Sequence, residues 1–211
     1  DNTFATPVLQ NPLEHGASVV LHSTTKYLGG HSDTVGGALL MNDDKLWEQL
    51  KYFQNAIGAT PGPFDCWLVL RGTKTLHVRV QRHCENAKRI AEWLSKRKDV
   101  VEIHYPGLKS DAGHAVAKKQ MSDFGGMISF VLKGTLERSV KFISATKLFA
   151  LAESLGGVES LIEHPASMTH GSIPREERLK AGLSDGLVRL SVGIEDVEDL
   201  IGDLEQALAI K

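Results

Sequence analysis

The sequence is poor in cysteine, in long apolar runs and in net charge. Its two cysteines, Cys66 and Cys84, exclude a disulfide framework and lie too far apart for a Cys-x-x-Cys metal or redox motif. No stretch approaches the roughly 18 apolar residues of a membrane-spanning helix, and no signal peptide is predicted. With 24 basic and 26 acidic residues, the net charge of −2 indicates neither nucleic acid nor a membrane surface as a partner. We therefore expect a reduced, cytoplasmic protein.

The remaining composition is typical of a globular chain. The 211 residues are 42% hydrophobic and 24% charged, and a chain of this length can bury a sizeable core. At about 150 residues per domain, the length predicts one large or two small domains. The chain opens at Asp1, without a methionine and inside a recognisable motif, which indicates a fragment, a processed chain or a partial sequence.

The first third of the chain has an α/β pattern. Short apolar runs at 17–22 and 37–41 lack polar alternation, which predicts strands buried on both faces of a parallel sheet. A glycine-rich segment at 29–37 separates them and predicts a shaped loop. The cluster at 42–44 offers an N-cap for a helix that we expect to reach about Phe53.

The rest of the chain has an α+β pattern. Apolar residues at helical spacing predict one long helix over about 64–98. Strands are predicted at three places, and the last two alternate as half-exposed antiparallel strands do: 100–104, 127–132 and 187–192. An apolar stripe predicts a final helix near 197–208. We place a boundary near residue 78, with an α/β domain over 1–77 and a small α+β domain over 78–211.

The densest cluster of chemically useful residues surrounds Lys26. Lys26 follows a predicted buried strand, and ligand sites in parallel α/β sheets lie beyond the carboxyl ends of strands. A partly desolvated lysine there becomes an amine nucleophile able to form a Schiff base. The hydroxyls of Ser23 and Thr25 suit a phosphate, and pyridoxal phosphate (PLP) carries both an aldehyde and a phosphate. A solvated lysine at the end of a strand is the alternative.

Two further charged residues gain meaning beside such a cofactor. Asp1 could pair with a pyridinium nitrogen, although alone it is an ordinary terminal charge. Arg189 lies in the middle of a half-buried strand, where its guanidinium could bind a substrate carboxylate or form an ion pair with a protein carboxylate. The small-residue segment 151–157 could bind a carboxylate through its backbone, or could simply be a turn.

Other motifs are incomplete. Residues 71–75 resemble the end of a P-loop but lack its upstream glycine. His164 and His170 are weak candidates for a ligand pair, and no metal site is predicted.

The motifs together resemble the PLP-dependent enzymes of cysteine and methionine metabolism, which include cystathionine γ-lyase, γ-synthase and β-lyase. The resemblance covers essentially the whole chain, over 1–7, 22–33, 151–161, 164–170 and 187–195. It implies a fold-type I PLP-dependent transferase-like fold, with the back part of the large α/β domain followed by a complete α+β C-terminal domain. Roughly the first half of a family member, including the aromatic ring that stacks on the cofactor, is not found in this sequence.

The resemblance also implies roles for individual residues. Lys26 would carry PLP and then move protons at the substrate carbons. Asp1 would pair with the pyridinium nitrogen, and Ser23 and Thr25 would bind the phosphate. The implied assembly is a homotetramer of two dimers with shared active sites.

The expected substrates are small sulfur amino acids. Arg189, helped by Ser154, would bind the α-carboxylate, and Glu153 matches the γ-lyase and γ-synthase pattern, where a carboxylate suits the distal amino group of cystathionine. We expect γ-elimination or γ-replacement on cystathionine or an O-acyl-homoserine. Alternatives are a methionine γ-lyase, an O-acetylhomoserine sulfhydrylase, and an inactive fragment or assembly partner.

Overall fold

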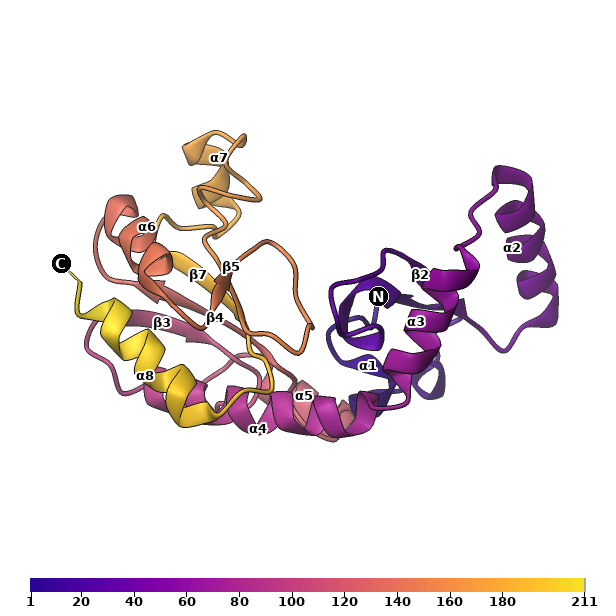
Figure 1. Cartoon of the computed structure of the whole chain (residues 1–211), viewed down its shortest axis with the longest axis horizontal. Coiled ribbons are helices and arrows are strands. Elements are labelled where there is room, and N and C mark those ends of the chain that lie inside the picture. Colours follow the sequence, from indigo (N-terminus) through magenta and orange to yellow (C-terminus); the bar gives the residue numbers. More distant parts are fainter. Residues whose placement is uncertain (211) are drawn as a thin grey trace.

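The computed structural model describes residues 1–210 and consists of two packed regions joined by one long helix (Figure 1). The first region contains short strands and helices around the turn at residues 24–30, which contains Lys26 and is called the Lys26 turn below. Its elements are α1 (Thr6–Leu9), the short turn η1 (Pro12–His15), β1 (Val20–Ser23), the turn η2 (Thr24–Leu28), β2 (Gly37–Leu40), α2 (Asp44–Ile57) and α3 (Pro63–Thr73).

The second region is built around a five-stranded sheet. Its elements are α4 (Leu76–Leu94), β3 (Val100–His104), α5 (His114–Gln120), β4 (Met127–Leu132), α6 (Leu136–Ala145), β5 (Ala150–Leu151), β6 (Leu161–Glu163), α7 (Arg175–Lys180), β7 (Leu187–Ser191) and α8 (Val197–Leu208). The strand order is β3-β4-β7-β6-β5, and every neighbouring pair is antiparallel except the parallel β5 and β6.

The alternating strands divide this sheet into an apolar face and a polar face. Ile128 of β4, Leu190 of β7 and Ile162 of β6 form one row across the sheet and belong to the apolar core that also contains residues of α4, α6 and α8. Figure 1 shows these three helices beside the sheet. Ser129, Arg189 and Glu163 form the adjacent row on the opposite face. The predicted strands and their alternation are therefore confirmed, and the polar face carries the candidate site.

The expectation that the two predicted strands of the first third pair in parallel was wrong. β1 and β2 pair antiparallel, with Val20 opposite Leu40, and they form a separate two-stranded sheet. The intervening segment is a turn and loop that returns the chain, whereas a parallel pair needs a crossover connection. An unbroken apolar run cannot by itself distinguish these two arrangements.

The helix predicted over 64–98 is two helices. α3 ends at Thr73 and α4 begins at Leu76, because Thr75 hydrogen-bonds the Gly72 carbonyl with both its backbone N–H (3.2 Å) and its hydroxyl (3.1 Å). The predicted N-cap near α2 is confirmed, since the Asp43 carboxylate accepts from two backbone N–H groups. That helix continues to Ile57, beyond the expected end.

Two apolar cores share α4. The larger core lies between the sheet and its covering helices and includes Ile90 and Leu94 from the second half of α4. The smaller core packs Tyr27 and Leu155 against Val80 in the first half of α4. No helix within residues 1–210 is long and apolar enough to cross a membrane. The domain boundary near residue 78 stays a prediction.

Candidate active site

Lys26 lies in a tight turn directly after β1. The Gly29 N–H donates to the Thr24 carbonyl (2.9 Å), and the Gly30 N–H donates to the Lys26 carbonyl (2.8 Å). At Lys26 itself the backbone leaves the helical conformation, with φ −92° and ψ −129°. The segment 29–37 that follows is a loop, as its glycines predict, and it ends where β2 begins. The turn therefore holds Lys26 at the boundary between the two regions.

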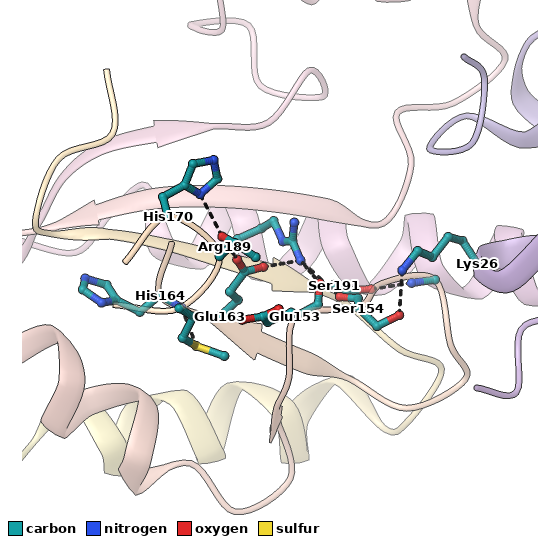
Figure 2. Close-up of polar contacts among 11 residues, drawn as sticks. Lys26, Glu153, Ser154, Glu163, His164, His170, Arg189 and Ser191 are labelled. Atoms are coloured by element: carbon teal, nitrogen blue, oxygen red, sulfur yellow. Dashed lines mark hydrogen bonds and ion pairs between the residues drawn. The ribbon is translucent and has the colours of Figure 1, made fainter. Parts of the chain in front are cut away.

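The Lys26 amine meets a residue far away in the sequence. Its Nζ donates a hydrogen bond to Ser154 Oγ at 2.9 Å, and Figure 2 shows the lysine reaching towards Ser154 from the opposite side of the site. Partial burial lowers the pKa of Lys26, and the nearby positive charge of Arg189 lowers it further, while Glu163 opposes the shift. The amine therefore loses its proton more readily than an ordinary lysine and becomes a better nucleophile.

A buried arginine, Arg79, binds the backbone of the Lys26 turn. The sequence analysis did not identify this residue. Its guanidinium donates to the carbonyls of Tyr27 (2.8 Å), Leu28 (3.4 Å) and Gly72 (2.9 Å). Gly30 packs so closely, at φ +75°, that a Cβ there would lie 2.3 Å from Arg79 Nη1. Arg79 thus ties the turn to α4 and to the end of α3. Only the tertiary contacts reveal this role.

The segment 151–157, which contains Ser154 and is called the Ser154 segment below, packs against the same turn. Gly156 has φ +77°, and a Cβ there would lie 2.7 Å from the Tyr27 backbone nitrogen, so this close approach requires glycine. The Gly156 N–H donates to Ser191 Oγ (2.8 Å), and the Val158 N–H donates to the Gly30 carbonyl (2.9 Å). The segment 151–157 therefore includes a turn whose place beside Lys26 is fixed by its backbone.

Arg189 lies further along the site, on β7 (Figure 2). Its Nη2 donates to the carbonyls of Glu153 (2.7 Å) and Ser154 (3.2 Å) and also contacts the Glu163 carboxylate. The ion pair considered from the sequence is thus present. The same contacts hold the guanidinium against the Ser154 segment, so Lys26, Ser154 and Arg189 form one continuous polar chain.

The structure places the other predicted residues as follows. The Asp1 carboxylate accepts from the Thr3 N–H (2.9 Å), and the Thr3 hydroxyl accepts from the Ser23 N–H (2.9 Å), which links Asp1 to the end of β1. The Thr25 hydroxyl accepts from the Gly36 N–H (2.9 Å) and also contacts the Gly36 carbonyl (3.3 Å). Glu153 is exposed, and its backbone carbonyl makes the contact with Arg189.

The two histidines considered as a ligand pair have separate partners. His164 Nδ1 lies 2.8 Å from Ser167 Oγ, and its Nε2 lies 2.9 Å from the Asp185 carbonyl, which identifies it as part of the structural framework. His170 Nδ1 lies 2.8 Å from Thr169 Oγ1. Among the 210 residues described, no three histidine, cysteine or carboxylate side chains are grouped to hold a metal ion.

Comparison with known proteins identifies relatives along the whole chain. Residues 1–209 match the family described as Cys/Met metabolism PLP-dependent enzyme. The chain is 60% identical over 209 residues to a cystathionine beta-lyase of Coxiella burnetii, covering 99% of this chain and 54% of that protein. It is 57% identical over 208 residues to a cystathionine gamma-lyase of Dictyostelium discoideum, again covering 99% and 54%.

Solved structures agree with this assignment. The cystathionine gamma synthase of Xanthomonas oryzae pv. oryzae, in complex with aminoacrylate and cysteine, superimposes with a TM-score of 0.95 at 53% identity, over 99% of this chain and 54% of that one. The chain therefore spans about half the length of the relatives it matches, and the expected fold-type I architecture is confirmed over that half. The chain belongs to the Cys/Met metabolism family of PLP-dependent enzymes.

Proposed function

We propose that the protein containing this chain is a PLP-dependent transsulfuration enzyme that catalyses γ-elimination or γ-replacement on cystathionine or an O-acyl-homoserine. The observation that carries the proposal is the polar chain from Lys26 through Ser154 to Arg189. It combines a nucleophilic amine with a guanidinium suited to a carboxylate. The backbone carbonyls of Glu153 and Ser154 hold the guanidinium at its distance from the amine. Membership of a PLP-dependent family supports the same reading.

The residues around Lys26 fit the chemical groups of PLP. Lys26 offers a partly desolvated amine with a lowered pKa to the aldehyde. Ser23 Oγ makes no hydrogen bond within residues 1–210 and could donate to the phosphate, with Thr25 beside it. The Asp1 carboxylate could pair with the pyridinium nitrogen. When bound, the cofactor supplies an acceptor for the electron pair released at the substrate Cα.

The chain's own residues would then orient the substrate and move protons. Arg189 binds the α-carboxylate, and the Ser154 hydroxyl adds a second polar contact. Lys26 Nζ, as a free amine, would take the proton from Cα and return it to a neighbouring carbon. Because Ser154 Oγ lies 2.9 Å from Nζ, this hydroxyl positions the amine for both transfers. Glu153, exposed at the rim of the site, would face the distal amino group of cystathionine.

β-Elimination is a second candidate, favoured by the 60% identity to a cystathionine beta-lyase. The products of cystathionine distinguish the two reactions. γ-Cleavage gives cysteine, 2-oxobutanoate and ammonia, whereas β-cleavage gives homocysteine, pyruvate and ammonia. Methionine and O-acetylhomoserine, offered as separate substrates, test for a methionine γ-lyase or a sulfhydrylase. Glu153→Val should lower the preference for cystathionine over methionine, and an unchanged preference would exclude the role given to Glu153.

The domain boundary near residue 78, a homotetrameric assembly and a cytoplasmic location belong to the same proposal. Large apolar side chains are exposed on α2 and α3, which suits a surface that the rest of the protein or a second subunit covers: Trp47, Tyr52, Phe53, Ile57, Phe64, Trp67 and Leu70. Sedimentation of the full-length protein measures the number of subunits.

Borohydride reduction of the full-length protein tests the proposed cofactor site. We expect an intact mass near twice 23.0 kDa and a pyridoxyl phosphate adduct that maps to the Lys26 peptide. Lys26→Ala should lose both the adduct and all turnover of cystathionine. An adduct on another lysine, or turnover that survives in Lys26→Ala, would refute the proposal. A 23 kDa protein without an adduct would support the inactive-fragment alternative.

A further inference from the structure

Glu163 is a buried carboxylate to which the proposed reaction gives no role. It ends β6, is 1% exposed, and stands directly opposite Arg189 in the register of β6 and β7. Desolvation makes an unpaired carboxylate very costly at such a position. Its partners are therefore essential to its presence on the polar face of the sheet.

Both oxygens of Glu163 are held. Oε2 contacts Arg189 Nη2, and Oε1 accepts a hydrogen bond from Thr169 Oγ1 at 2.5 Å. Because this bond uses the only hydroxyl proton of Thr169, its oxygen must accept at the 2.8 Å contact with His170, whose Nδ1 then carries a proton. Figure 2 shows His170, Glu163 and Arg189 in this order. The carboxylate is thus fixed at both ends beside the guanidinium.

Arg189 retains capacity for a ligand in this arrangement. Within residues 1–210 its contacts all use Nη2, and a guanidinium carries five N–H groups, so those of Nε and Nη1 remain for an incoming carboxylate. The side chain is 23% exposed, which leaves it accessible. A ligand carboxylate bound there would stand close to the negative charge of Glu163.

We propose that Glu163 is an internal counterion of Arg189 that weakens the attraction of the guanidinium for the ligand's carboxylate. The inference rests on the proposed carboxylate-binding role of Arg189. Neutralising Glu163 removes a like charge a few ångströms from the ligand, while the two backbone carbonyls still hold Arg189 in place. In a partly buried site, a charge at that separation changes affinity by about tenfold.

Protection of Arg189 against phenylglyoxal, mapped by peptide mass in the full-length holoprotein, tests the inference without relying on turnover. The probe is propionate, and neutral propionamide is its control. We expect Glu163→Gln to lower the half-protecting propionate concentration about tenfold. Glu163→Asp, which keeps the charge, should stay within about twofold of the wild type. Glu176→Gln, a charge removed from the exposed first turn of α7, should behave as the wild type.

The outcomes separate the two proposals. Equal protection of the wild type and Glu163→Gln, or a weaker effect in the variant, overturns the counterion role alone. Propionate that protects Arg189 in neither protein overturns the carboxylate role of Arg189 and the inference with it. An equal gain with propionamide also contradicts the inference, because a charge effect must depend on the ligand's charge. If Glu163→Gln does not fold, the smaller neutral Glu163→Ser gives the same test.

Discussion

Removing the Arg79 guanidinium should loosen the Lys26 turn without unfolding the rest of the protein. Arg79 is 4% exposed and makes two short hydrogen bonds, to the carbonyls of Tyr27 and Gly72. Hydrogen bonds from a charged donor contribute about 1.5–3 kcal/mol each, so the pair contributes about 3–6 kcal/mol. Burial of the guanidinium, which also lowers its pKa, offsets part of this sum. For Arg79→Met we therefore expect a net loss of about 3 kcal/mol in the local free energy of opening.

Hydrogen exchange of the peptide over 24–30, followed by mass spectrometry in the full-length protein, measures that loss. At about 1.4 kcal/mol per tenfold, exchange of the Gly29 and Gly30 amides should accelerate about 100-fold. Arg82→Met is the matched control, because Arg82 lies on the same helix but is exposed and forms an ion pair with Glu85, away from the turn. Exchange in Arg79→Met that stays within threefold of Arg82→Met would refute the reasoning.

Three further predictions concern the framework of the site. Gly156→Ala should cost about 3 kcal/mol in the free energy of unfolding by urea and also weaken borohydride labelling of Lys26, because the new Cβ meets the Tyr27 backbone; unchanged labelling would contradict this. Burial lowers the pKa of His83 to about 4, below its unfolded value of 6.5, so the unfolded state gains a proton first as the pH falls. The contribution of His83 to stability should therefore drop by up to about 3 kcal/mol between pH 6.5 and 4, and His83→Asn should make the pH dependence smaller; an equal drop in both proteins excludes it. Asp203→Asn should cost about 2–3 kcal/mol and lower the melting temperature, since one carboxylate accepts from three successive backbone N–H groups after α6; an unaltered melting temperature would argue against that role.

The local elements that the sequence predicted are those with a clear period or cap. The alternation at 127–132 and 187–192 and the stripe at 197–208 correspond to β4, β7 and α8, because each buries one face against a single layer. The antiparallel pairing of β1 and β2 was not predictable, because an apolar run specifies burial but not direction. The break between α3 and α4 depends on Thr75, whose side chain competes for a backbone carbonyl.

The residues of the candidate site could be predicted from the sequence mainly because they belong to family motifs. Lys26 and Ser154 are 128 positions apart, and no local pattern predicts that their side chains meet at 2.9 Å. Arg79 and Glu163 have no motif of their own, because their roles arise only from tertiary contacts with the Lys26 turn and with Arg189. The roles of Asp1, Ser23 and Thr25 at a cofactor stay predictions.

The sharing of α4 by both apolar cores has a mechanical consequence. Its 19 residues span about 28 Å, and its first half supports the Lys26 turn while its second half lies under the sheet that carries Arg189. A tilt of only 5° about the middle of this helix would displace each end by about 1 Å in opposite directions. α4 therefore couples the position of the Lys26 turn to that of the sheet that carries Arg189, so a tilt of this helix would change the distance between the amine and the guanidinium.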